Sequence, residues 1–290
     1  MDFDYIHLRP RAKINLTLEI TGRRADGYHE ISTVMQTLRL RDDLFISKTP
    51  RKEIYLATEN LTLPPEENLV HKAARLLEPL YREKFSGGIS MRLVKRIPSE
   101  AGLGGGSSDA AAALRGLNRL FELGLAPAEL ERLGAGLGAD VPFFIRGGTR
   151  LARGIGEILT PLPPCPPLWV VLAKPPFAVL TAWAYGKLDE TGDFGAPAEF
   201  DFTGDTLNLR EIARKAQNFL QAPVAARHPE IVEIAAFLRR RGALLAMMSG
   251  SGSCVFGLFE NPNKARAAKD ALPRRFGGVW AAVTKTFSCG

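Results

Sequence analysis

Hydrophobic positions follow two periods along the chain, and together they predict a mixture of strands and helices. Apolar residues alternate with polar ones over Ile14–Ile20, the period of a half-buried strand, and Ile89–Ile97 is also expected to be a strand. Over Glu66–Tyr81 apolar residues recur at helical spacing, which predicts an amphipathic helix. The alanine-rich segment from about Asp109 to Phe121 predicts a second helix.

Similar patterns continue beyond residue 160 and predict an α+β fold in two halves. Proline fills five of the seven positions from Pro161 to Pro167, which makes this segment the best linker candidate. We therefore predict one domain over residues 1–160 and a second over residues 161–290. In the second half, strands are expected at Trp169–Ala173, Leu244–Met248, Cys254–Phe259 and Val279–Thr286, and helices at Thr181–Asp189, Leu207–Leu220, Glu230–Arg241 and Lys264–Leu272.

Charge and composition narrow the classes of partner. The formal net charge of +7 favours anionic partners such as nucleotides or phosphorylated metabolites. The basic residues are scattered, and the densest run, Arg239–Arg241, is interpreted as the last turn of a helix, so no nucleic-acid partner is predicted. The three cysteines have no paired spacing, and no apolar run is long enough to span a membrane. We expect a cytoplasmic protein without a membrane partner.

A cluster of glycines before the alanine-rich helix is the strongest local signal. Four glycines fall within five residues, and glycine permits unusual backbone angles and close approach of the backbone to a ligand. The helix that follows offers free N–H groups and a positive dipole end to an anion. We predict an ATP-binding phosphate loop, with a plain flexible loop as the alternative. The loop comprises Pro98, Ser99, Glu100, Ala101, Gly102, Leu103, Gly104, Gly105, Gly106, Ser107 and Ser108.

Two common phosphate-loop patterns do not account for this segment. No Gly-Lys-Ser or Gly-Lys-Thr follows it, so it is not a Walker A loop. Counted from Gly102, the third glycine of a dinucleotide-binding fingerprint would fall at Ser107. The sequence therefore indicates a phosphate loop of another type.

Three segments together resemble the GHMP kinases, a family of small-molecule kinases. These segments are Ala12–Leu16, Pro98–Ser108 and Met248–Ser253. Three further segments resemble the branch of the family that phosphorylates a cytidine diphosphate-linked methylerythritol, and they are Gly22–His29, Ala101–Ala111 and Gly138–Phe144. The matches keep their order over nearly the whole chain. One departure is Arg11, where the family often has proline.

The resemblance implies a fold and a reaction. The N-terminal domain would be similar to domain 2 of ribosomal protein S5, and the C-terminal domain would be ferredoxin-like. ATP would phosphorylate the 2-hydroxyl of 4-diphosphocytidyl-2-C-methyl-D-erythritol, in the non-mevalonate route to isoprenoid precursors. Mg²⁺ is expected with ATP, but no carboxylate pair identifies its ligands, and they stay unassigned.

By the same resemblance, Asp140 and Lys13 would be the catalytic residues. Asp140 would take the proton of the acceptor hydroxyl, although from the residues alone a helix cap before Pro142 is the more ordinary interpretation. Lys13 would keep that carboxylate ionised and stabilise the attacking oxygen, whereas most lysines at strand starts are solvated. Asn15, on the same polar strand face as Lys13, would bind the erythritol end.

The cytidine half of the substrate would be recognised by Tyr28, His29 and Tyr185. An imidazole can hydrogen-bond the edge of cytosine, and an aromatic ring can stack on the base or the ribose. The resemblance carries these roles, since a packed tyrosine or a surface histidine would otherwise be ordinary. Another loop would support the phosphate loop rather than act in catalysis, and it comprises Ser249, Gly250, Ser251 and Gly252.

Two alternative functions stay open. A homoserine or mevalonate kinase would share the phosphate loop but would have no use for Tyr28 and His29. A nucleotide- or RNA-binding module without chemistry would fit the positive charge but would need neither Lys13 nor Asp140. We expect a small-molecule substrate and a monomer or weak homodimer.

Overall fold

The computed structural model describes residues 5–288, which form two compact units. Unit 1 is built from residues up to 12, 40–97 and 104–146, and unit 2 from residues 13–39, 98–103 and 147 onward. Each unit therefore combines segments that are distant in the sequence. The domain boundary predicted at residue 160 stays a prediction.

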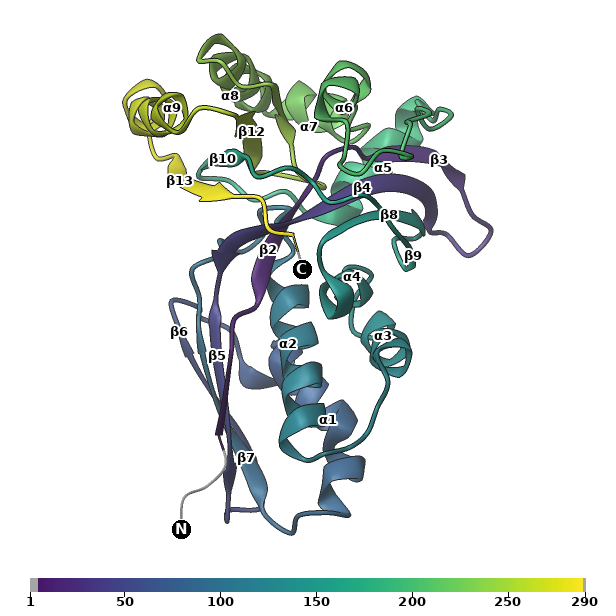
Figure 1. The fold of residues 1–290 in the computed structure, drawn as a ribbon, viewed down its shortest axis with the longest axis vertical. Coiled ribbons are helices and arrows are strands. Elements are labelled where there is room, and N and C mark those ends of the chain that lie inside the picture. The colour runs from purple at the N-terminus through teal and green to yellow at the C-terminus, as the bar shows by residue number, and fades with distance from the viewer. Residues whose placement is uncertain (1–4, 289–290) are drawn as a thin grey trace. The chain divides into compact units, whose positions relative to one another are not determined.

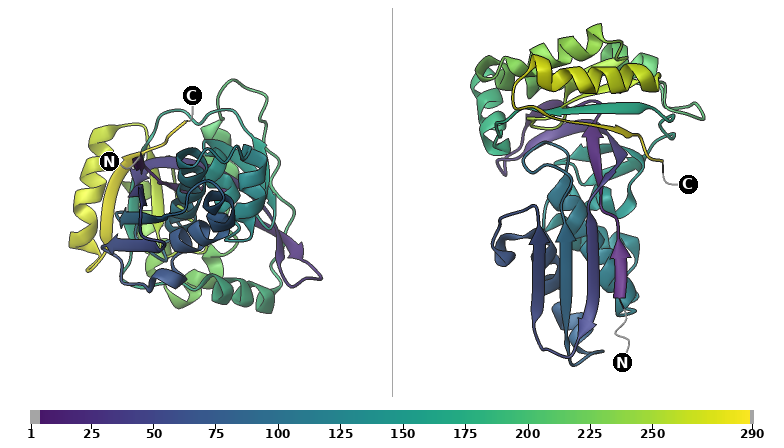
Figure 2. Two further views of the ribbon diagram at one scale, coloured as in Figure 1. Left: turned by 90° about the horizontal axis from the view of Figure 1, so that it is seen from below. Right: turned by 90° about the vertical axis from the view of Figure 1, so that its left-hand side faces the viewer.

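Unit 1 is a four-stranded sheet with helices on one face (Figures 1 and 2). The strand order is β1-β5-β7-β6, and only the β6–β7 pair is parallel. Helices α1 and α2 pack on each other and on the sheet, while α3 and α4 pack next to α2. The elements are β1 (Tyr5–Leu8), β5 (Asp43–Thr49), β6 (Ile54–Glu59), η1 (Pro65–Glu67), α1 (Leu69–Arg82), β7 (Gly88–Val94), α2 (Gly105–Leu120), α3 (Pro127–Ala135) and α4 (Val141–Arg146).

Unit 2 contains two sheets and the remaining helices. The antiparallel sheet β11-β12-β10-β13 carries α8 and α9 on one face (Figure 1). The other sheet has the order β2-β4-β8-β9, with β3 paired to β4. Apolar residues of both sheets, such as Ile20, Ile31 and Val171, belong to one buried core.

The helices and strands of unit 2 have the following bounds, although residues 11–12 of β2 and 40–41 of β4 belong to unit 1. The strands are β2 (Arg11–Asn15), β3 (Glu19–Arg23), β4 (His29–Arg41), β8 (Thr149–Gly154), β9 (Ile158–Pro161), β10 (Trp169–Lys174), β11 (Leu245–Met248), β12 (Val255–Phe259) and β13 (Trp280–Lys285). The helices are α5 (Thr181–Thr191), α6 (Leu209–Lys215), α7 (Gln221–Arg227), α8 (Glu230–Arg240) and α9 (Pro262–Arg275). The predicted α+β class is confirmed.

Two predicted elements are wrong in their extent. The helix expected over Leu207–Leu220 ends at Lys215, since the backbone of Ala216 is extended. Beyond it, the side-chain amide of Asn218 donates hydrogen bonds to the carbonyls of Met248 and Gly250. The alanine-rich helix begins at Gly105 rather than Asp109, so the last four residues of the glycine loop are its first turn.

The strand predicted over Ile14–Ile20 is also wrong. It is divided into β2, which ends at Asn15, and β3, which begins at Glu19. Its polar residues are not solvated either, since Asn15 and Glu19 are each 2% exposed, and Lys13 directly before it is 4% exposed. Both faces of this segment are buried, so its polar side chains need partners inside the protein.

Two further sequence predictions can be compared with the described residues. No helix within residues 5–288 is long and apolar enough to cross a membrane. Cys165 and Cys254 are free and buried, while Cys289 lies outside the described residues. Burial raises the pKa of each of these two thiols to about 12.

Candidate active site

The glycine loop leads directly into helix α2 of unit 1. Gly104, the residue before the helix, has a φ of 68°, a conformation that favours glycine. Its carbonyl accepts a hydrogen bond from Ser108 N at 2.9 Å, whereas the first N–H groups of α2 have no acceptor within the helix. A 16-residue helix that starts on glycines presents these donors and its positive end together. This is the geometry that phosphate binding requires, and the binding itself stays a prediction.

In unit 2, the earlier half of the glycine loop lies against the Ser249–Gly252 loop. Ser249 Oγ donates to the carbonyl of Gly102 at 2.9 Å. A Cβ placed on Gly102, which has a φ of +69°, would lie 1.9 Å from the carbonyl oxygen of Ser249. Only glycine fits this position, because a side chain would collide with backbone. The contact is what a supporting role for the Ser249–Gly252 loop requires.

A buried group of charges that was not predicted lies beneath the start of α2. Lys95 Nζ donates to Asp42 Oδ2 at 2.5 Å and to Asp109 Oδ2 at 2.6 Å. We call Asp42, Lys95 and Asp109 the buried triad. A Cβ on Gly105 would be 3.2 Å from Lys95 Nζ, so the ammonium lies against the first residue of the helix. The triad therefore ties the phosphate loop to the sheet of unit 1.

The buried triad has two carboxyl groups for one cation. The pKa of Asp109 is raised to about 8, chiefly by burial and also by Asp42, against the opposing effect of the Lys95 ammonium. Burial lowers the pKa of Lys95, but Asp109 and Asp42 outweigh it and leave a net rise. Asp109 Oδ1 has no hydrogen-bond partner among the described residues, whereas Asp42 also accepts from the backbone N–H groups of Arg96 and Ile97.

The sequence does contain a signal for the triad. In the strand that precedes the loop, Ile89, Met91 and Leu93 alternate on the buried face, and Lys95 continues that alternation. Asp109 likewise stands directly before four buried alanines of α2. A charged residue in a buried register predicts a buried partner of opposite charge.

Lys13 and Asn15 belong to a buried polar network in unit 2. Lys13 Nζ donates to Asn15 Oδ1 at 2.6 Å, and Asn15 Nδ2 donates to Thr33 Oγ1 at 2.8 Å. The backbone N–H of Asn15 donates to Ser249 Oγ at 3.3 Å. The network holds the ammonium of Lys13 in one orientation. It also joins two of the predicted sites, the Lys13–Asn15 pair and the Ser249–Gly252 loop.

Asp140 lies in the turn that precedes α4 in unit 1. It is half-buried, and its carbonyl accepts a hydrogen bond from Phe144 N at 3.4 Å. A Cβ on Gly138 would lie 3.6 Å from Ser107 Oγ. The segment that carries Asp140 is therefore packed against the first turn of α2, where the phosphates are expected.

His29 and Tyr185 meet in unit 2, as a shared role in base recognition requires. Their ring centroids are 4.7 Å apart with an interplanar angle of 31°, and the ring of Phe194 lies 6.0 Å from that of His29. His29 Nε2 is 2.6 Å from Asp189 Oδ1. Tyr28, by contrast, is 60% exposed in the turn between β3 and β4.

Two further members of this group were not predicted. Asp189 lies four residues after Tyr185 on α5, a spacing that places both on the same face of the helix. Arg23 Nη1 lies 3.7 Å from Asp189 Oδ2. We call Arg23, His29, Tyr185 and Asp189 the histidine cluster. The helical spacing was visible in the sequence, but the pairing with His29 was not.

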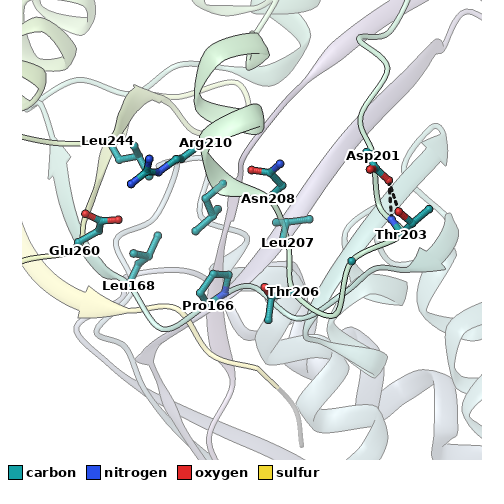
Figure 3. Close-up of a pocket in the computed structure, with 12 residues that line it drawn as sticks. Pro166, Leu168, Asp201, Thr203, Thr206, Leu207, Asn208, Arg210, Leu244 and Glu260 are labelled. Atoms are coloured by element: carbon teal, nitrogen blue, oxygen red, sulfur yellow. Dashed lines mark hydrogen bonds between the residues drawn. The ribbon is translucent and has the colours of Figure 1, made fainter.

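The described residues do not identify a metal site. Residues 5–288 contain no group of three or more His, Cys, Asp or Glu side chains that could hold a metal ion. A separate cavity of about 510 Å³ in unit 2 is lined by Asp201, Asn208, Arg210 and Glu260, among others (Figure 3). Asp201 is engaged by Thr203, whose N–H and hydroxyl both donate to it. None of the predicted site residues lines this cavity.

Similarity to known proteins identifies the family to which this chain belongs. The family models for the GHMP kinase N-terminal and C-terminal domains match residues 68–148 and 201–278. The 4-diphosphocytidyl-2-C-methyl-D-erythritol kinase of Lachnospira eligens is 42% identical over 287 residues, which cover 98% of this chain and 99% of that protein. The protein of the same name from Pelotomaculum thermopropionicum is 45% identical and covers 96% of both.

The chain belongs to the 4-diphosphocytidyl-2-C-methyl-D-erythritol kinase family of GHMP kinases. A crystal structure of 4-(cytidine 5'-diphospho)-2C-methyl-D-erythritol kinase is similar, with 36% identity, a TM-score of 0.79 and coverage of 98% of this chain and 100% of that one. Homoserine kinase from Cytophaga hutchinsonii shares the fold, with a TM-score of 0.72 at 18% identity and coverage of 98% of this chain and 95% of that one. The predicted resemblance and the two-domain GHMP kinase fold are confirmed. A binding module without chemistry is set aside, since the family consists of kinases.

Proposed function

We propose that this chain transfers the γ-phosphoryl group of ATP to the 2-hydroxyl of 4-diphosphocytidyl-2-C-methyl-D-erythritol, in the non-mevalonate route to isoprenoid precursors. The chain aligns over nearly its whole length with relatives named 4-diphosphocytidyl-2-C-methyl-D-erythritol kinase, and this supports the substrate. ATP is the co-substrate of GHMP kinases. The observation that carries the proposal lies in unit 1. There the segment of Asp140 packs against the glycine-rich start of α2, so a base and an anion site adjoin each other.

Phosphoryl transfer requires positioning and charge stabilisation more than covalent help from the protein. The N–H groups and dipole of α2 bind the phosphates, and Asp140 takes the proton of the attacking hydroxyl. Lys13 stabilises the charge on the reacting oxygens, and its hydrogen bond to Asn15 preorganises the ammonium. We expect Mg²⁺ to accompany ATP; this ion commonly keeps several waters and binds through substrate phosphates, and its protein ligands stay unassigned.

The histidine cluster supports a cytidine-bearing acceptor over a smaller one. His29 and Tyr185 together offer a ring for stacking and a nitrogen for the edge of a base. Tyr28, in the exposed turn before them, is assigned to the same half of the substrate. Homoserine and mevalonate contain no base, so a kinase for either would leave these groups without a role. The cysteine spacing, which shows no pairs, favours a reducing compartment, so we place this activity in the cytoplasm. We expect the enzyme to be a monomer or a weak homodimer.

A coupled ATP-turnover assay tests the proposal. Purified protein is offered 4-diphosphocytidyl-2-C-methyl-D-erythritol, mevalonate or homoserine under the same conditions. We expect ADP release only with the cytidylated substrate, and phosphorus NMR should show a new monophosphate ester on the erythritol. Turnover of mevalonate or homoserine at a comparable rate would contradict the proposed acceptor.

A further inference from the structure

The imidazole of His29 is fixed on one side by Asp189. The two side chains meet through Nε2 and Oδ1 at 2.6 Å, and the histidine side chain is only 9% exposed. The ring also packs against Tyr185 and Phe194, which fixes its plane. Tyr185 and Asp189 are one turn apart on α5, so one helix determines both the stacking and the hydrogen bond.

This contact decides which ring nitrogen carries the hydrogen. An ionised carboxylate can only accept, so Nε2 must be the donor in the bond to Asp189. The other oxygen of Asp189 faces Arg23 at 3.7 Å, which keeps the carboxylate directed into the cluster. In the neutral ring the second nitrogen, Nδ1, then has no hydrogen and is an acceptor. Among residues 5–288, no group donates to Nδ1, so it is available to a ligand.

An acceptor at Nδ1 distinguishes the two pyrimidines. Cytosine carries an amino group at position 4 and can donate, whereas uracil carries a carbonyl oxygen there and cannot. We propose that Asp189 is a positioning residue that makes His29 accept a hydrogen bond from the 4-amino group, and that it thereby selects cytidine over uridine in the substrate. This inference rests on the proposed function, because it takes His29 to face the base. A site built around one hydrogen-bond direction rejects the analogue that offers the opposite one.

The test compares two substrates that differ only at the base. Steady-state kinetics at pH 8 are measured with 4-diphosphocytidyl-2-C-methyl-D-erythritol and with its uridine analogue, for wild type, Asp189→Asn and Asp189→Ala. An amide can present either N–H or C=O to Nε2, and alanine presents neither, so both variants lose control of the histidine tautomer. We expect the ratio of kcat/KM values for cytidine over uridine to fall about tenfold, on the scale of one hydrogen bond and its unsatisfied partner. The Kd for ATP should stay unchanged.

Glu190→Gln is the matched control. Glu190 is the next residue on the same helix and accepts hydrogen bonds from Lys187. Its substitution by glutamine removes the same charge as Asp189→Asn. Its base preference should equal that of the wild type, and thermal unfolding confirms that all variants are folded. Calorimetric titration with CDP and with UDP gives the same ratio without turnover.

The outcomes separate the two proposals. If the wild type phosphorylates the cytidylated substrate and both Asp189 variants keep its base preference, the role of Asp189 is refuted and the proposed function stands. If the wild type does not act on the cytidylated substrate, the proposed function falls and this inference falls with it. A drop in the preference of Glu190→Gln equal to that of Asp189→Asn would show a general charge effect and would also overturn the inference.

Discussion

The buried triad and the histidine cluster are both small groups of charged side chains, but they differ in exposure. The side chains of the triad are between 0% and 6% exposed. Those of His29, Asp189 and Arg23 are 9%, 23% and 59% exposed. A charge removed from water needs a partner of opposite charge inside the protein, whereas partly exposed charges are screened and contribute little to stability.

The difference indicates two uses of charge in this kinase. In the triad, charge fixes the backbone on which the phosphates are expected to lie. In the histidine cluster, the more exposed Asp189 and Arg23 orient the ring of a residue that we assign to substrate recognition. Variants of the triad should therefore change mainly stability, and variants of the histidine cluster mainly specificity.

Asp140→Asn should show the largest effect on activity, and it belongs to neither group. The amide cannot accept the proton of the acceptor hydroxyl, so turnover should fall by roughly 10²–10⁴-fold. The free energy of unfolding should change little, because the buried triad is intact. Single-turnover kinetics and urea unfolding measure the two effects. Near-normal turnover would mean that Asp140 is only a helix cap.

Lys95→Met should cause the largest loss of stability. This change leaves the buried carboxyl groups of Asp42 and Asp109 without a cation. Breaking such a buried ion pair lowers the free energy of unfolding by about 3–5 kcal/mol. Asp189→Ala, which breaks the corresponding pair in the histidine cluster, should cost less than about 1 kcal/mol. Urea unfolding of both variants gives the comparison. Equal losses would show that exposure does not distinguish the two groups.

Gly102→Ala should be more damaging than Gly27→Ala. Both glycines have positive φ, but an added Cβ meets the Ser249 carbonyl at Gly102 and nothing within 4 Å at Gly27. Strain and the collision together should cost about 2–4 kcal/mol at Gly102, against about 1 kcal/mol at Gly27. Unfolding experiments and the Kd for ATP measure the consequences. If the two variants behave alike, the contact with Ser249 is unimportant.

His29→Ala and Tyr185→Ala should impair only the use of the cytidylated substrate and leave ATP binding unchanged. Loss of a base hydrogen bond or a stacking ring should lower kcat/KM by the equivalent of roughly 1–3 kcal/mol. Calorimetric titration with an ATP analogue should give an unchanged Kd. A selective loss of ATP affinity would instead assign these rings to the nucleotide donor.

The pH dependence of stability should report on Asp109. Its pKa is about 8 in the folded protein, above the ordinary value of 3.8, so the folded state binds more protons than the unfolded state between these values. The free energy of unfolding should therefore fall as pH rises from about 4 to 8, by at most about 1.4 kcal/mol per pH unit, and this contribution should level off above pH 8. The difference between wild type and Asp109→Asn isolates the effect. A difference that does not vary with pH would rule out a protonated Asp109.

Local patterns were sufficient for the parts of the fold that depend on neighbouring residues. The period of three to four residues located α1, and the glycine cluster located the start of α2 to within four residues. The three family segments were contiguous, so they identified the GHMP kinase family without a structure. Lys95 shows that even a buried charge can leave a local signal, since it continues the buried alternation of β7.

Only the tertiary structure decided which distant groups meet. Lys13 was placed on the polar face of a half-buried strand, but both faces of that segment are covered, and its ammonium is bonded inside the protein. His29 and Asp189 are separated by 160 positions, and Asn15 and Ser249 by 234. Periodicity states which face of an element is buried, but it does not state what covers that face. The partners of a buried polar side chain are set by the packing of distant segments, and for that reason the sequence named His29 as a site residue but not the carboxylate that orients it.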